Sequence, residues 1–173
     1  MSHASDGDLH DNPQTRGMAE FVAGLAYESV PAEVLNRIKL LMLDSVGCAL
    51  YGSDLPWTRI LQQTLAEHDT SQGCAIWGTG LRLSAPHAAL VNGTASHALD
   101  FDDCNNTMGG HPSAPVLSAL LPLADEHGST GADFVLAYVA GFEVETKIAL
   151  AVNFHHYQKG WHPTATLGVF GAA

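Results

Sequence analysis

Basic residues are scarce in this sequence of 173 residues, in which seven Lys and Arg stand against eighteen Asp and Glu. The resulting formal net charge of -11 repels nucleic-acid phosphates and anionic lipid headgroups at long range. We therefore expect neither nucleic acid nor a membrane surface among its partners.

Long apolar runs are missing as well, since no segment approaches the roughly 20 apolar residues that cross a bilayer as a helix. Even the stretch from Leu40 to Leu50 is short and contains Asp44 and Ser45. The opening residues, MSHASDGDLHDN, hold three Asp and no Lys or Arg, which is the reverse of a secretory or mitochondrial leader. We expect a disordered tail over residues 1–15 and a cytoplasmic location.

Closely spaced cysteines are also absent. Cys48, Cys74 and Cys104 are odd in number and far apart, which argues against a disulfide framework and for a reducing compartment. Because an iron–sulfur cluster needs several thiolates on one cage, the lack of a CxxC pair makes such a cluster unexpected. We expect the protein to work without a cofactor.

Helical periodicity dominates what the sequence does contain. The hydrophobic content of 46% is sufficient for one core, and proline or small polar residues mark helix starts at Asn12-Pro13, Pro31 and Ser84. We expect an all-α helical bundle with one short extended piece near residues 75–77. The expected helices begin near residue 13 and at about 31–52, 58–68, 85–99, 112–126, 130–151 and 163–173.

Polar side chains concentrate in the segment HALDFDDCNNTMGGHPSAP, which holds three acids within four positions. Like charges this close raise the proton affinity of at least one carboxylate or require a partner. Asp100 is the expected reactive acid, because it lies three residues after His97 on the same predicted helical face. The alternative is that Asp100, Asp102 and Asp103 are solvated at a helix end.

His111 and His162 each precede a proline and a small hydroxyl residue, in HPS and HPT. Proline in a first helical turn holds the preceding residue extended, so its side chain points beyond the helix end. Both imidazoles are therefore expected to face one anion-binding cleft, although each is also compatible with a plain capping role.

A metal site is a rival interpretation, because His97, Asp100, Asp103 and His111 are all competent ligands. The sequence contains no HExxH, HxH or calcium-loop spacing. We therefore expect no metal.

Four motifs together resemble the MmgE/PrpD family, which includes 2-methylcitrate dehydratase and cis-aconitate decarboxylase. They are HALDFDD, GHPSAPVLSALLPLA, AGFEVE at residues 140–145 and GWHPTATLGVFGAA. The resemblance implies a homodimeric enzyme whose active site lies between a large helical domain and a smaller α/β lid. Residues 16–173 would form an incomplete helical domain. The helical signal still continues at Ala173, so we expect a fragment whose Gly168 and Gly171 pack against something absent.

The same resemblance implies roles for individual residues. Asp100, His111 and His162 fall where the family places catalytic groups, while Cys104 stands where a threonine is usual in the substrate site. The family's catalytic lysine would lie beyond the sequence. Lys159, three residues before His162, is a further candidate for binding a substrate carboxylate, although a solvated surface position is the favoured alternative.

The resulting hypothesis is a cofactor-independent lyase that removes water from a small tricarboxylate such as 2-methylcitrate. Decarboxylation of cis-aconitate needs the same anion binding and is the first alternative. A different class of answer is a truncated, inactive helical interaction module whose Ala/Gly-rich end is its binding face.

Overall fold

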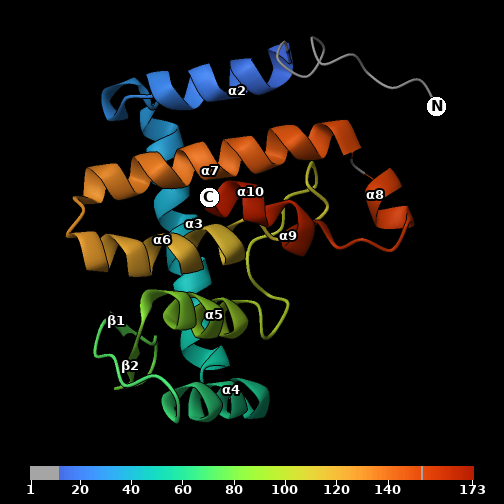
Figure 1. Cartoon of the computed structure of the whole chain (residues 1–173). Helices are drawn as coiled ribbons and strands as arrows, with labels where there is room; N and C mark the ends of the chain where they lie inside the picture. The colour runs from blue at the N-terminus through green and yellow to red at the C-terminus, as the bar shows by residue number, and fades with distance from the viewer. Residues whose placement is uncertain (1–11, 153) are drawn as a thin grey trace.

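The computed structural model of the chain describes residues 12–152 and 154–173. It is predominantly helical and contains one small antiparallel pair of strands, which confirms the predicted fold class. In Figure 1, α2, α7, α6, α5 and α4 follow one another from top to bottom, and α3 crosses and contacts α5, α6 and α7. The short helices α9 and α10 lie between α6 and α7.

The helices differ from the predicted ones mainly at their ends. They are α2 (Pro13–Gly24), α3 (Ala32–Gly52), α4 (Pro56–Ala66), α5 (Ala85–Ser96), α6 (Ser113–His127), α7 (Gly131–Val152), α8 (His155–Gln158), α9 (Pro163–Thr166) and α10 (Gly168–Ala172), with a 3₁₀ turn η1 at Tyr27–Ser29. The strands β1 (Cys74–Ala75) and β2 (Arg82–Leu83) pair with Cys74 opposite Leu83. The sequence did not predict α8, and the predicted last helix is divided into α9 and α10.

The start of α2 corrects the predicted tail. Asn12 caps the helix, because its Oδ1 accepts hydrogen bonds from the backbone N–H groups of Gln14 and Thr15, and Pro13 occupies the first helical position. Residues 13–15 are therefore helical. The rest of the predicted tail, residues 1–11, lies outside the described residues.

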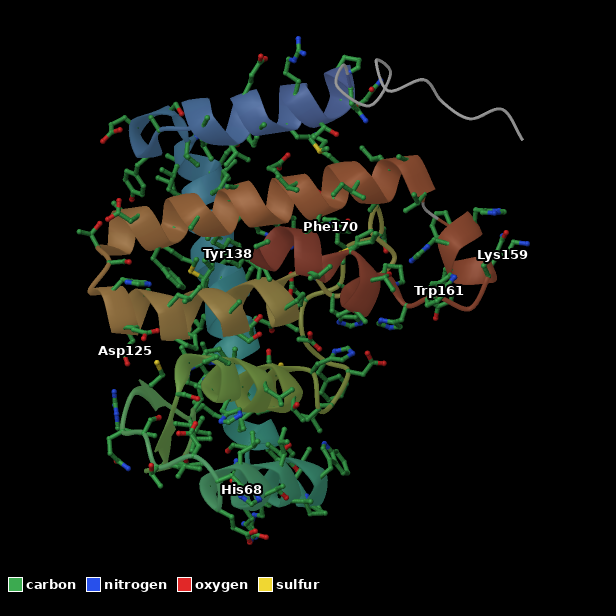
Figure 2. The ribbon with its side chains drawn as sticks, viewed as in Figure 1. His68, Asp125, Tyr138, Lys159, Trp161 and Phe170 are labelled. Carbon is green, nitrogen blue, oxygen red and sulfur yellow. The ribbon has the colours of Figure 1, made fainter. Side chains whose placement is uncertain are left out.

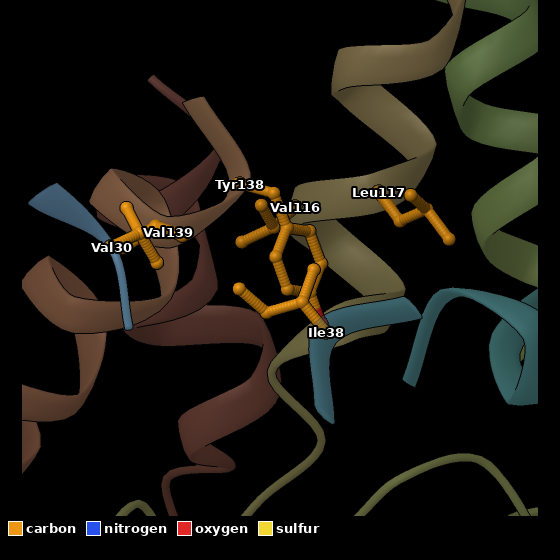
Figure 3. Close-up of a cluster of buried hydrophobic side chains, with 6 residues drawn as sticks. All are labelled: Val30, Ile38, Val116, Leu117, Tyr138 and Val139. Atoms are coloured by element: carbon orange, nitrogen blue, oxygen red, sulfur yellow. The ribbon is translucent and has the colours of Figure 1, made fainter. Parts of the chain in front are cut away.

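The main core forms where α3, α6 and α7 meet, and Figure 3 shows its six buried side chains. They are Val30, Ile38, Val116, Leu117, Tyr138 and Val139. A smaller cluster of Met108, Ala149 and Leu167 attaches the loop before α6 to α7 and to the α9–α10 segment. Because Met108 is fully buried, this cluster fixes the loop that carries the polar residues of the site.

Close packing of α10 against α6 and α7 depends on glycine. A Cβ atom at Gly141 would lie 2.3 Å from the backbone oxygen of Gly171, and one at Gly168 would lie 2.4 Å from Pro115 Cγ. Gly168 and Gly171 therefore pack within the chain, and the expectation that they contact something absent from it is wrong.

No described helix is long and apolar enough to cross a membrane. All three cysteines are free thiols.

Glu145, on α7, is a fully buried acid with no hydrogen-bond partner for either carboxylate oxygen among the described residues. Burial raises its pKa to about 9, and the nearby charge of Asp103 contributes in the same direction. Glu145 is therefore protonated in the folded chain at neutral pH.

Replacing Glu145 by Gln is expected to remove a pH dependence of stability. The folded chain keeps this proton between the usual pKa of 4.5 and about 9, whereas the unfolded chain loses it, so stability falls as the pH rises through that window. At pH 7 the linked free energy amounts to about 3 kcal/mol. Urea unfolding from pH 5 to 9 measures it, and an equal pH dependence in Glu145→Gln would contradict the assignment.

Candidate active site

The end of α5 differs from the prediction and determines where the acids lie. The helix ends at Ser96, with His97 as its C-cap, so the predicted end at Leu99 is three residues too late. Asp100 has a φ of 57°, in the left-handed region that a residue other than glycine enters at a cost of about 1 kcal/mol. The prediction that Asp100 shares a helical face with His97 is therefore wrong.

The acid that pairs with His97 is Asp102, whose side chain is completely buried. Its Oδ1 lies 2.9 Å from His97 Nδ1. This hydrogen bond is the main cause that raises the pKa of His97, while burial of the ring opposes it. The second oxygen, Oδ2, has no partner among the described residues. The same Oδ1 also lies 3.4 Å from His111 Nδ1. A buried carboxylate is strongly favoured to keep its cationic partners, so Asp102 holds the His97 ring in place.

The prediction that one acid of this group has an elevated pKa is met by Asp103. Burial is the largest cause, and hydrogen bonds from Ser113 oppose it. Ser113 also hydrogen bonds to Tyr138 in the core. Asp103 is therefore turned towards the start of α6 and the main core.

His111 contacts two acids of this segment, Asp100 and Asp102. Its Nδ1 lies 3.1 Å from the backbone oxygen of Asp102, and its Nε2 lies 3.1 Å from Asp100 Oδ1. Because a carbonyl oxygen only accepts, Nδ1 carries a proton and donates it to Asp102. The partner that the sequence assigned to Asp100 was His97, whereas the observed ion pair is with His111.

The first turn of α9 also holds His111. The backbone N–H of His111 donates a hydrogen bond to Thr164 Oγ1 at 2.9 Å. The preceding residue, Gly110, approaches so closely that a Cβ atom there would lie 2.8 Å from the same oxygen. The glycine of the GHPSAP motif is thus required for this contact between loop and helix.

His162 lies immediately before α9 as predicted, in extended conformation with Pro163 at the first helical position. His111 is one position further from its helix, because Pro112 is the N-cap of α6. The ring centroid of His97 lies 4.6 Å from that of His111 and 6.1 Å from that of His162. Two imidazoles, those of His111 and His162, therefore lie beside the ring of His97. Asp100, which is exposed, pairs with His111.

A cavity of about 630 Å³ adjoins this cluster. His97 and Thr164 line it, together with residues of α4, α5 and α6 such as Trp57, Gly93 and Ser118. A volume of this size holds a small organic acid. His97 is thus the member of the histidine cluster that lines this hollow.

The two predicted substrate-binding residues lie elsewhere. Cys104 is exposed and lines a separate cavity of about 290 Å³ with Arg37 and Tyr138. Lys159 is the C-cap of α8, and Figure 2 shows it at the outer edge of the molecule near Trp161. No ion pair joins Lys159 to the histidine cluster in the described part of the chain.

Three donors of the cluster are close enough to share a metal ion. Ligand atoms of His97, Asp102 and His111 lie within 4.8 Å of one another. This set differs from the one suggested by the sequence, because Asp102 replaces Asp100 and Asp103. His97 hydrogen bonds to the Asp102 carboxylate and His111 to the Asp102 backbone oxygen, an arrangement that also serves proton transfer.

Asp102 and Thr164 are residues of the candidate site that the sequence did not predict. Asp102 was expected only as a solvated acid at a helix end. The hydroxyl residue of the HPT motif was noted only as a neighbour of His162, and its contact with His111 spans 53 positions of sequence.

Known proteins similar to this chain identify its family. Residues 16–173 match the model of the MmgE/PrpD N-terminal domain. The chain is 29% identical over 167 residues to the cis-aconitate decarboxylase-like protein oryM of Aspergillus oryzae, covering 92% of the chain and 35% of that protein. It is 30% identical to the cis-aconitate decarboxylases of Aspergillus terreus, over 89% of the chain and 33% of the relative, and of Homo sapiens, over 92% and 34%. The chain thus spans about a third of the length of these curated relatives. It belongs to the MmgE/PrpD family.

Proposed function

We propose that this chain provides the histidine and aspartate groups of a cofactor-independent lyase that acts on a small tricarboxylate. The observation that carries the proposal is the contact between His111 Nε2 and Asp100 Oδ1 at 3.1 Å. His162 and the neighbouring cavity complete the site.

The contact between His111 and Asp100 requires a proton between the two groups. Because His111 Nδ1 already donates to the carbonyl of Asp102, Nε2 of a neutral ring would have a lone pair facing the carboxylate. A proton must therefore lie between Nε2 and Oδ1, on one atom or the other. Asp100 is 77% exposed while the His111 side chain is 13% exposed, so a substrate reaches this proton from the side of Asp100.

Positive charge near the cavity favours a carboxylate substrate. Asp102 raises the pKa of His97, which increases the fraction of imidazolium beside the hollow at neutral pH. This local charge opposes the repulsion expected from the formal net charge of -11.

Two reactions use the same groups. In dehydration, a base removes a proton from carbon and an acid protonates the departing hydroxyl group. In decarboxylation, the bond to a carboxylate carbon breaks, carbon dioxide leaves, and the remaining carbanion takes up a proton. The Asp100–His111 pair supplies the proton in either case, and His162 serves as the second proton carrier.

The names of the relatives favour decarboxylation. Three of them are described as cis-aconitate decarboxylases or as similar to one, whereas dehydration of 2-methylcitrate was the first interpretation of the sequence. We therefore propose tricarboxylate lyase activity and place cis-aconitate beside 2-methylcitrate as the substrate to test.

Turnover by the complete product of the gene tests the function, because its relatives are about three times as long as this chain. The protein is incubated separately with cis-aconitate and with 2-methylcitrate, and products are followed by proton NMR. One of the two acids is expected to lose carbon dioxide or water. Absence of turnover of both, with this chain and with the complete protein, would favour the interaction module instead.

Asp100→Asn and His111→Asn are each expected to lower kcat by at least about 100-fold, the usual contribution of a positioned acid or base. His68→Asn is the matched control, since His68 is an exposed histidine just after α4 and is not among the residues that line the cavity. If either site variant retains the kcat of the control, the proposed proton pair is not part of the reaction.

Chelation is expected to leave turnover unchanged. The activity is measured before and after dialysis against EDTA, and again after adding Zn²⁺ or Mg²⁺. Loss of activity on dialysis followed by rescue with a divalent ion would instead assign the His97, Asp102 and His111 donors to a metal.

A further inference from the structure

His97 is not needed for the proton pair, yet it occupies the centre of the histidine cluster. Its ring centroid lies 4.6 Å from that of His111 and 6.1 Å from that of His162. The side chain also lines the cavity of about 630 Å³. Its Nδ1 is engaged by Asp102, and no hydrogen bond of its Nε2 is found within the described residues. The ring therefore offers one free nitrogen beside a hollow that can hold an organic acid.

We propose that His97 binds a carboxylate of the substrate through Nε2–H and that Asp102 is the residue that positions it for this task. The inference rests on the proposed function, because it names the group that holds the substrate beside the Asp100–His111 pair.

Charge and burial support this assignment. An imidazolium donates from both nitrogens, so His97 can give one N–H to Asp102 and the other to an incoming anion. The charged and titratable groups around it are Asp100, Asp102, His111 and His162. The hydrogen bond with Asp102 is the largest influence and raises the pKa of His97. The side chain is 33% exposed, so it is accessible to a ligand but only partly hydrated.

Asp102 acts most strongly on the His97 ring. Its Oδ1 lies 2.9 Å from His97 Nδ1 and 3.4 Å from His111 Nδ1, while its backbone oxygen accepts a hydrogen bond from His111. Replacement by Asn keeps the backbone oxygen and removes the negative charge. Asp102→Asn therefore perturbs mainly the pair with His97 and leaves the backbone contact of His111 in place.

Histidine NMR on the chain tests the positioning role without any turnover. In the unmodified chain, His97 is expected to carry its neutral-state proton on Nδ1 and to titrate above the ordinary histidine value. In Asp102→Asn the pKa of His97 is expected to fall, because its main hydrogen-bond partner loses its charge. An unchanged titration of His97 in this variant would overturn the role of Asp102.

Kinetics of the complete protein test the binding role. His97→Phe keeps an aromatic ring in the cluster but removes the donor, and it is expected to raise KM about 10- to 100-fold while kcat changes only a few-fold. His97→Gln, which keeps a neutral donor, should recover part of the loss. A fall in kcat with unchanged KM would contradict the proposal.

The chain offers a matched control in His87, on α5, the helix whose C-cap is His97. The Nδ1 of His87 lies 2.7 Å from Asp69 Oδ2, and its side chain is 39% exposed, close to the value for His97. His87→Phe therefore removes a similar histidine–aspartate pair that is not part of the cavity lining. It is expected to leave KM unchanged, and an equal rise in both variants would indicate general destabilisation rather than lost binding.

Citrate binding separates failure of this inference from failure of the proposed function. Citrate is titrated into the chain while the histidine ring signals are recorded, so no catalysis is needed. Selective shifts of His97 that weaken at least tenfold in His97→Phe or Asp102→Asn support a carboxylate site even if no lyase activity is found. Equal citrate affinity in all variants would overturn the proposed site.

Discussion

The arrangement of the site depends on one buried aspartate, Asp102. Its side chain is withdrawn from solvent and binds His97, while its backbone oxygen accepts from His111. A carboxylate buried in this way is stable only with a cationic or hydrogen-bonding partner, so the pairing is enforced by desolvation rather than by local sequence. Because one residue holds two rings, the separation of the imidazoles is fixed by the short segment between α5 and α6.

The helices serve mainly to bring that segment and the start of α9 together. Met108 anchors the loop in a small core with Ala149 and Leu167, and Gly110 allows the loop to approach Thr164. The α9–α10 segment is itself packed on α6 and α7 through glycines. The polar site is therefore built at a junction of apolar contacts, which restricts the motion of its rings and prepares them for a ligand.

The sequence predicted the helical fold and most of its elements, because periodicity and capping are local signals. Asn12 and Pro163 illustrate this, since each marks a helix start that the structure contains. It predicted the wrong end for α5, because the left-handed conformation of Asp100 depends on tertiary contacts. Similarly, the inward turn of Asp102 and the bond between Thr164 and His111 join distant parts of the chain, which no local pattern encodes. The family motifs named Asp100, His111 and His162, but not the acid that positions their neighbours.

A crystal structure of the protein with citrate bound at neutral pH tests the central claim most directly. Citrate is expected in the cavity beside α5, with a carboxylate oxygen within hydrogen-bonding distance of His97 Nε2 and Asp102 still bound to Nδ1. Citrate bound away from His97, or a His97 ring turned away from Asp102, would contradict it.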